Sequence, residues 1–73
     1  MIERELFLEN FRELFDETPI EEIQFETRFR NLDEWSSLIV LSLIVHFEDN
    51  YKVKLTLEVI DKCNTIEDLF KLV

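Results

Sequence analysis

Apolar residues recur at helical spacing near the start of the chain. Over residues 2–16 they repeat about every 3.6 positions and fall on one side of a helix, with Glu5 and Glu13 on the other side. The apolar positions are Phe7, Phe11, Leu14 and Phe15, with Leu8 near the edge. We therefore predict an amphipathic helix over residues 2–16 whose apolar side faces the core.

A second helical pattern covers residues 36–50, with Ser36 as the N-cap. One arc of this helix is expected to face the core and consists of Val40, Leu41, Leu43, Ile44, Phe47 and Tyr51. The other arc consists of Leu38, Ile39, Ser42, Val45, His46 and Asp49. Three members of this outer arc are aliphatic, which predicts a docking surface for a partner. The alternative is that the preceding loop or a second copy of the chain covers them.

Between the two helices, residues 17–35 predict a long ordered connection. Thr18-Pro19 begins a turn or a single helical turn, because proline suits the first helical position. Four apolar residues are spaced too irregularly for one helix and are expected to hold the connection onto the body: Ile23, Phe25, Phe29 and Leu32. A connection of this length is uncommon unless it has a functional role.

The last third of the chain predicts an extended connector and two further helices. Residues 50–55 form the connector, Thr56 caps a short helix over residues 57–61, and Thr65 caps a fourth helix with Asp68 at the capping-box position. The inner face of the fourth helix consists of Ile66, Leu69, Phe70 and Val73. The predicted fold is all-α: a small four-helix bundle with three main helices, one short helix and a long first loop, in a single domain over residues 1–73.

Charge and composition narrow the classes of partner. The 73 residues carry a net charge of −9, so the chain is expected to repel nucleic acid and anionic membrane surfaces. Partners with basic patches are expected, although the charge serves equally well for solubility alone. No apolar run reaches the roughly 20 residues of a membrane helix, and residues 1–5 are too charged for a signal peptide. With a single cysteine, Cys63, we expect a cytoplasmic protein.

The spacing and the composition of the sequence argue against a catalytic site. Ser37 and His46 are nine residues apart in one predicted helix, which separates them by about 13 Å and half a turn. His46 is the only histidine, so no other Ser–His pair is available. The chain has no glycine, which excludes a P-loop and a dinucleotide-binding fingerprint. We predict neither enzymatic activity nor a metal site, with His46 at a surface rim and Cys63 as a small buried filler.

The stretch from Asp33 to Leu41 places hydroxyl groups at the start of the second predicted helix. The first turn of a helix leaves backbone N–H groups unpaired and carries the positive end of the macrodipole. Such an end favours a nearby phosphate group. A serine at this point is therefore either a simple cap or the attachment point of a phosphodiester.

Over most of its length the chain resembles the acyl carrier protein family, in the branch where a tryptophan precedes the Asp-Ser-Leu motif. The resemblance is carried by Asp33-Glu34-Trp35-Ser36-Ser37-Leu38, by Phe47 and Tyr51, by Val53 and Leu55, and by Thr65-Ile66-Glu67-Asp68-Leu69. It implies that Ser37 carries 4′-phosphopantetheine, which a separate phosphopantetheinyl transferase takes from coenzyme A and joins to the hydroxyl.

By the same resemblance, the thiol of the arm would hold an acyl or aminoacyl group as a thioester, as in fatty acid or polyketide biosynthesis. The carrier itself would catalyse nothing and would present its cargo to acyl-loading and acyl-using enzymes that dock on the second helix. The docking residues would be Ser36, Leu38, Ile39, Ser42, Val45, Glu48 and Asp49. We expect a monomer, with a weak dimer through the outer aliphatic residues as the alternative.

The chain differs from the family pattern at three points. Ser36 replaces the aspartate that precedes the modified serine, the loop before the motif has no glycine, and the front half of the second helix has Ile39 and Ser42 instead of acids. These differences predict docking through aliphatic contacts more than ion pairs, and partners unlike the standard fatty-acid enzymes. The replaced aspartate also favours an alternative function, a carrier-like interaction module that has lost phosphopantetheinylation.

Overall fold

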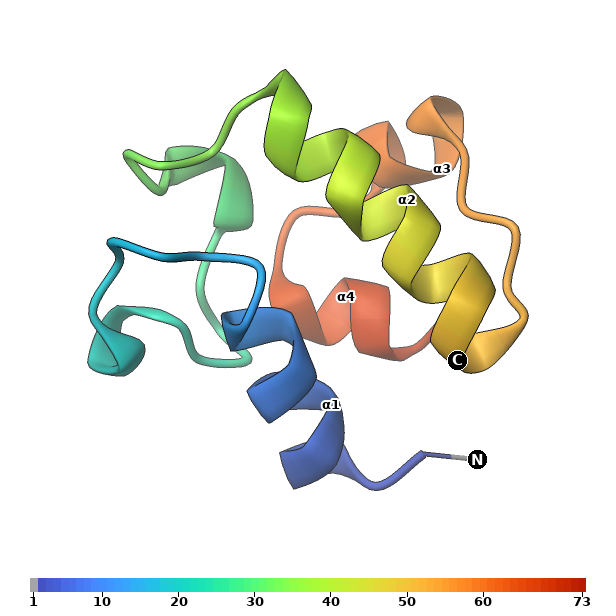
Figure 1. Ribbon diagram of the computed structural model, residues 1–73, viewed down its shortest axis with the longest axis horizontal. Helices are drawn as coiled ribbons and strands as arrows, with labels where there is room; N and C mark the ends of the chain where they lie inside the picture. Colours follow the sequence, from blue (N-terminus) through green and yellow to red (C-terminus); the bar gives the residue numbers. More distant parts are fainter. Residues whose placement is uncertain (1) are drawn as a thin grey trace.

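The computed structural model describes residues 2–73 and shows an all-α fold with a long first connection, as predicted. In chain order the elements are α1 (Arg4–Arg12), the 3₁₀ turns η1 (Ile20–Glu22) and η2 (Phe29–Asn31), α2 (Ser37–Tyr51), α3 (Leu57–Lys62) and α4 (Ile66–Phe70). Figure 1 shows α2 running obliquely across the molecule, with α4 between α1 and α2 and the first connection at the left. Two helices are long and two are short, because α4 has only five residues and not the length of a main helix.

The core is organised around the ring of Phe7 on α1, which is 1 % exposed. Its centroid lies 5.9 Å from that of Phe47 on α2 and 5.2 Å from that of Phe70 on α4, both in edge-to-face orientation. This orientation is favoured because the positive ring edge meets a negative ring face. The buried hydrophobic residues are Phe7, Leu8, Phe11, Phe15, Ile23, Phe29, Ile39, Leu43, Phe47, Leu55, Ile60, Cys63, Ile66 and Leu69.

Helix α1 is shorter than the predicted range of residues 2–16 and ends at Arg12. The chain then forms tight turns, in which Leu14 N–H donates to Phe11 O at 3.1 Å and Phe15 N–H donates to Arg12 O at 3.0 Å. Such three-residue hydrogen bonds satisfy the last carbonyls of a helix and turn the chain away. Phe15 is buried through this turn, with its ring 5.5 Å from that of Phe11.

The long first connection is held to the body as predicted. Ile23 and Phe29 are buried, and Phe25 and Leu32 pack partly buried against the core. Polar bonds reinforce these contacts: Arg12 Nε donates to Ile23 O at 3.0 Å. Further along, the guanidinium of Arg30 donates to Ile60 O at 3.0 Å and to Cys63 O, two carbonyls at the end of α3. A cation suits this end of a helix because the macrodipole is negative there.

The same connection supplies the acceptors for the start of α4. Ile66 N–H donates to Thr27 O at 3.2 Å, and Glu67 N–H donates to Phe25 O at 3.0 Å. The predicted capping box is present, because Thr65 Oγ1 accepts from Asp68 N–H and the Asp68 carboxylate accepts from Thr65 N–H. The backbone N–H of Asn64 is the main cause of the lowered pKa of Asp68. The first N–H groups of α4 are therefore satisfied partly by the loop and partly by its own cap.

Helix α2 ends one residue later than the predicted range of residues 36–50, since Tyr51 is helical and does not belong to the connector. Lys52 stops the helix in the left-handed conformation, with φ 58°. Its N–H donates to Glu48 O at 3.2 Å, which is the bond of the αL capping motif, and Val53 N–H donates to Phe47 O at 3.3 Å. The helix end was missed because this position usually carries glycine, and the chain has none.

Candidate functional site

Two adjacent serines occupy the start of α2 and have different roles. Ser36 has extended backbone angles, and its hydroxyl accepts from Ile39 N–H at 3.4 Å, so it is the N-cap as predicted. Ser37 is the first helical residue, and its side chain is exposed. Because Ser36 supplies the cap, the hydroxyl of Ser37 is left available at the surface.

The electrostatic setting of Ser37 differs from that of the other helix starts. The first turns of the other three helices carry acids, namely Glu5 on α1, Glu58 on α3, and Glu67 and Asp68 on α4. The first turn of α2 carries none, although the chain has 17 acidic residues. The positive end of the longest helix is thus not neutralised within its own first turn. An exposed hydroxyl at this end fits a phosphodiester, since the unpaired first-turn N–H groups favour an anion.

The turn before Ser37 is fixed by the carboxylate of Glu34. This group accepts hydrogen bonds from Asp16 N–H at 2.8 Å, Glu17 N–H at 3.0 Å and the Thr18 hydroxyl at 2.7 Å. The bond from Thr18 is the largest cause of the lowered pKa of Glu34, and the backbone donors add to it. Next along the chain, the ring of Trp35 packs 4.9 Å from that of Phe29. The start of α2 is therefore tied to both ends of the long connection.

Replacing Glu34 with glutamine is expected to lower the thermal unfolding midpoint at pH 7. The lowered pKa means that the carboxylate stabilises the fold fully above the ordinary value of 4.5 and loses this contribution as the pH falls through the folded-state value. Protonated glutamate and glutamine are both neutral and similar in shape. The midpoints of wild type and Glu34→Gln, measured by circular dichroism, should therefore converge at low pH.

The control for this change is Glu26→Gln, which alters an exposed residue of the same connection. Its unfolding midpoint should follow that of the wild type at every pH. A constant gap between wild type and Glu34→Gln down to the lowest pH would show that the carboxylate charge of Glu34 has no part in holding the turn.

The exposed side of α2 is rotated from the predicted one, which corrects two residues. Ile39 was expected on the outer arc but is 8 % exposed, whereas Leu41 was expected on the inner arc and is 61 % exposed. Successive helical residues are about 100° apart, so Ile39 shares a face with buried Leu43, four residues on, and Leu41 shares one with exposed Val45. Ile39 is therefore removed from the predicted docking residues, and Leu41 is a docking candidate that the sequence pattern had assigned to the core.

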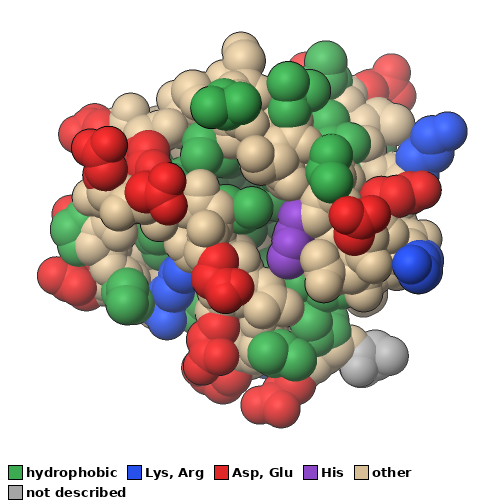
Figure 2. All heavy atoms as spheres, in the orientation of Figure 1, with side chains coloured by type: hydrophobic (Ala, Val, Ile, Leu, Met, Phe, Trp, Pro, Cys, Tyr) green, Lys and Arg blue, Asp and Glu red, His purple; other side chains and the backbone are tan. Residues whose placement is uncertain are grey.

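The surface that remains is a ridge of Leu38, Leu41 and Val45, here called the α2 ridge, which lies beside exposed Ser42 and begins next to Ser37. Glu48 and Asp49 are exposed toward the other end of the helix. Figure 2 shows hydrophobic side chains along the upper edge of the molecule, where α2 begins and α3 lies. A continuous exposed apolar surface of this kind is typical of an interaction site.

A shallow groove of about 320 Å³ extends the α2 ridge toward the connector that follows α2. Its apolar lining comes from Ile44, Val45 and Leu55, and its charged rim from Glu48, Asp49 and Lys54. A partner side chain with an apolar body and a basic end would match this distribution, because it meets aliphatic carbon first and carboxylates at the rim.

The contacts that the structure gives for His46 and Cys63 do not involve Ser37. The ring of His46 contacts Tyr51 Oη at 3.3 Å and Asn50 Nδ2 at 3.0 Å. Cys63 is a buried free thiol, as predicted, and burial raises its pKa so that the thiol form is favoured.

Within residues 2–73, no group of three or more His, Cys, Asp and Glu side chains is placed to hold a metal ion. Over the same residues, no helix combines the length and the apolar character needed to span a membrane.

Comparison with known proteins gives one family match. The family described as phosphopantetheine attachment site matches residues 5–73, a range that includes all four helices but the first residue of α1, and also Ser37. No curated protein and no solved structure matches the chain.

Proposed function

Because the chain belongs to the phosphopantetheine attachment site family, we propose that Ser37 is the residue to which the cofactor is joined. The family consists of carriers and not of enzymes, and its members hold 4′-phosphopantetheine covalently. The observation that supports Ser37 is its exposed hydroxyl at the first position of α2, beside a cap that Ser36 already provides.

Each residue of this site has a distinct task in the proposal. Ser37 supplies the oxygen that forms the phosphodiester, and Ser36 keeps the first turn capped while the hydroxyl of its neighbour is used. Glu34 holds the preceding turn in place through its three hydrogen bonds. The bound arm supplies a terminal thiol, on which an acyl or aminoacyl group is carried as a thioester.

We propose that the enzymes that load and use this cargo, and the transferase that attaches the arm, dock on the α2 ridge. Support comes from the position of the ridge, which starts one residue after Ser37, and from its high exposure. Ser36, Ser42, Glu48 and Asp49 flank the ridge as further contacts. The cytoplasmic location, the monomeric state and the exclusion of nucleic acid stay predictions from the sequence.

The function is tested by intact mass spectrometry of the purified chain after incubation with coenzyme A and a broad-specificity phosphopantetheinyl transferase. We expect a mass gain of one phosphopantetheine, followed by a second gain when an acyl-loading enzyme and its substrate are added. A chain that remains unmodified with several transferases would contradict the carrier function.

A second candidate function is favoured by one residue. Ser36 stands where the family has an aspartate that helps the transferase engage its substrate, so the chain would serve as an interaction module without an arm. In that case, partners recovered from cell extract bind wild type and Ser37→Ala equally, and the mass of the chain does not change with coenzyme A and transferase.

Truncating the α2 ridge is expected to slow modification without unfolding the chain. For Leu41→Ala we expect kcat/KM of the transferase to fall by about tenfold, which corresponds to a lost apolar contact of about 1.4 kcal/mol. Leu41 is 61 % exposed, so its truncation changes the free energy of unfolding by no more than about 0.5 kcal/mol.

The matched control is Ile20→Ala, since Ile20 is 62 % exposed and lies in η1 on the first connection. Its modification rate should equal that of the wild type. Equal losses in Leu41→Ala and Ile20→Ala would mean that exposed apolar surface matters only in general and that α2 is not the docking element.

A further inference from the structure

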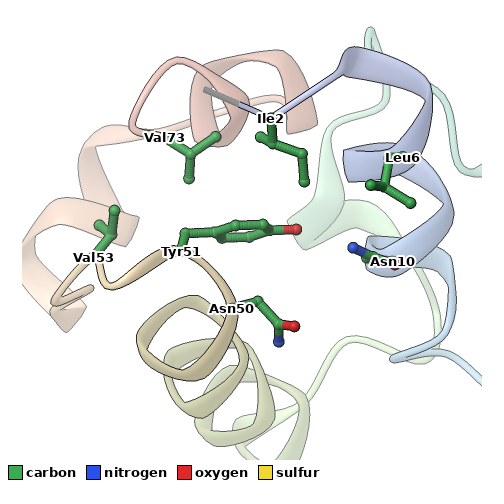
Figure 3. Close-up of a pocket in the computed structure, with 7 residues that line it drawn as sticks. All are labelled: Ile2, Leu6, Asn10, Asn50, Tyr51, Val53 and Val73. Atoms are coloured by element: carbon green, nitrogen blue, oxygen red, sulfur yellow. The ribbon is translucent and has the colours of Figure 1, made fainter.

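A second concave surface lies at the end of α2 opposite to Ser37. This groove, here called the terminal groove, has a volume of about 450 Å³ and is walled by Ile2, Leu6, Val53 and Val73. Its polar lining consists of Asn10, Asn50 and Tyr51. Figure 3 shows the ring of Tyr51 crossing the groove, with its hydroxyl directed toward Asn10. None of these side chains is charged, although 34 % of the residues in the chain are.

The orientation of the Asn50 amide follows from its two contacts with His46. Asn50 Nδ2 donates to His46 O at 3.0 Å, and a carbonyl oxygen can only accept, so this end of the amide is the NH₂ group. The same Nδ2 lies 3.0 Å from His46 Nδ1, which must therefore accept. The amide oxygen of Asn50 is left without a donor among residues 2–73 and is free to accept from a ligand in the terminal groove.

The same reasoning assigns the proton of the Tyr51 hydroxyl. Since His46 Nδ1 accepts, the neutral ring carries its proton on Nε2, which donates to Tyr51 Oη at 3.3 Å. Burial raises the pKa of Tyr51, and the side chain of Asn10 lowers it to a smaller extent. Tyr51 Oη thus accepts a hydrogen bond from His46 Nε2, and its own O–H remains available as a donor.

We propose that the terminal groove binds an uncharged peptide segment of a partner, through a secondary amide that carries an aliphatic side chain. The Tyr51 O–H donates to the carbonyl of this amide, and Asn50 Oδ1 accepts from its N–H. The aliphatic side chain lies against the apolar wall formed by Leu6, Val53 and Val73. A neutral segment fits because no side chain that lines the groove offers a counter-charge.

This site is independent of the proposed modification at Ser37. Asn50 follows Ser37 by thirteen positions in α2, which places the two sites about 20 Å apart along the helix axis. A carrier with both sites would contact one protein near Ser37 while a second segment holds the far end of α2.

The proposal is tested by NMR titration of the ¹⁵N-labelled chain with N-acetyl-leucine methylamide. We expect saturable shifts at the side-chain amides of Asn10 and Asn50 and at the backbone of Val53 and Val73. Tyr51→Phe, which keeps the ring and removes the hydroxyl, should weaken binding by about three- to tenfold, the range of one hydrogen bond. Glu26→Gln, at an exposed residue of the first connection that does not line the groove, should bind like the wild type.

The acceptor role of Asn50 has its own test. The methyl ester of N-acetyl-leucine keeps the shape of the probe but lacks the N–H that Asn50 Oδ1 would accept, so it should bind more weakly than the amide. Replacing Asn50 with alanine should abolish this preference for the amide over the ester. A urea unfolding curve of each variant serves to check that the chain remains folded.

The pH dependence of the preference for the amide over the ester gives a further test. A purely structural role of Asn50 would not make this preference depend on pH. Protonated His46 would present a donor at Nδ1, so the Asn50 amide would turn its oxygen toward the ring and away from the ligand. Desolvation lowers the pKa of His46, and Glu13 at the end of α1 and Asp49 on α2 raise it to a smaller extent. The preference for the amide over the ester should therefore hold at pH 7 and decline as the pH falls below about 6.5.

Two results would overturn the assignment. Absence of saturable shifts in the terminal groove would show that it binds no such amide. Saturation by pantetheine but not by N-acetyl-leucine methylamide would assign the groove to the cofactor arm and not to a peptide.

Discussion

Replacing Ser37 with alanine is expected to abolish attachment of phosphopantetheine completely, while Ser36→Ala remains a substrate. The phosphodiester needs an oxygen at residue 37, and no other group at the start of α2 replaces it, because the Ser36 hydroxyl faces the helix and accepts from Ile39 N–H. Intact mass spectrometry after incubation with coenzyme A and transferase measures both outcomes directly.

In this comparison, a loss of modification caused by unfolding has to be distinguished from one caused by removal of the attachment oxygen. Removing an N-cap hydroxyl costs about 0.5–2 kcal/mol, and the long 3.4 Å bond of Ser36 points to the lower end of that range. Ser36→Ala should therefore melt slightly earlier than the wild type and still be modified at 25 °C. Thr56→Ala, which removes the N-cap hydroxyl of α3, serves as the control for loss of a cap away from Ser37. Modification of Ser37→Ala, together with its loss in Ser36→Ala below the melting temperature, would place the attachment point at Ser36.

The substitution Phe7→Ala is expected to destabilise the chain by about 3–5 kcal/mol, the usual cost of truncating a buried phenylalanine. Phe7 is 1 % exposed, and its ring contacts five aromatic rings, those of Phe11, Phe25, Phe47, Tyr51 and Phe70. Removing the ring leaves a cavity that touches three helices and the loop, and such a site cannot collapse locally. Urea unfolding followed by circular dichroism measures the change.

A loss of this size removes a large part of the total stability. Domains of this length have about 0.05–0.15 kcal/mol of stability per residue, so roughly 4–11 kcal/mol is available. The neighbouring change Leu6→Ala, at a residue 48 % exposed, should shift the free energy of unfolding by no more than about 0.5 kcal/mol. Equal effects of the two substitutions would show that the aromatic cluster around Phe7 does not dominate the core.

Local chemistry made much of the fold predictable. Ser36, Thr56 and Thr65 were identified as N-caps because a cap depends on residues within one turn, and all three accept from the backbone N–H three positions on. Helix ends were less predictable. The end of α1 depends on Phe15 reaching Phe11 and Trp35, which are partners set by tertiary packing. The end of α2 depends on Lys52 adopting a conformation that its side chain disfavours.

The rotation of α2 could not be derived from its own sequence. Residues 38–41 are all aliphatic, so apolar side chains occur on every side of the first turns and the pattern does not indicate which side is buried. Tertiary packing decides it, and it buries Ile39 while exposing Leu41. The terminal groove was equally hidden, because Asn10 and Tyr51 lie 41 residues apart and meet only in the folded chain.

The hydrogen bonds from the start of α4 to the carbonyls of Phe25 and Thr27 govern how the chain acquires its structure. Isolated helices shorter than about 12–15 residues are marginal in water, so the five residues of α4 gain helical structure only by docking on the loop. Conversely, the carbonyls of Phe25 and Thr27 in the loop accept hydrogen bonds from those N–H groups only when α4 is in place. We therefore expect the loop and α4 to become ordered together, because each supplies hydrogen-bond partners that the other lacks.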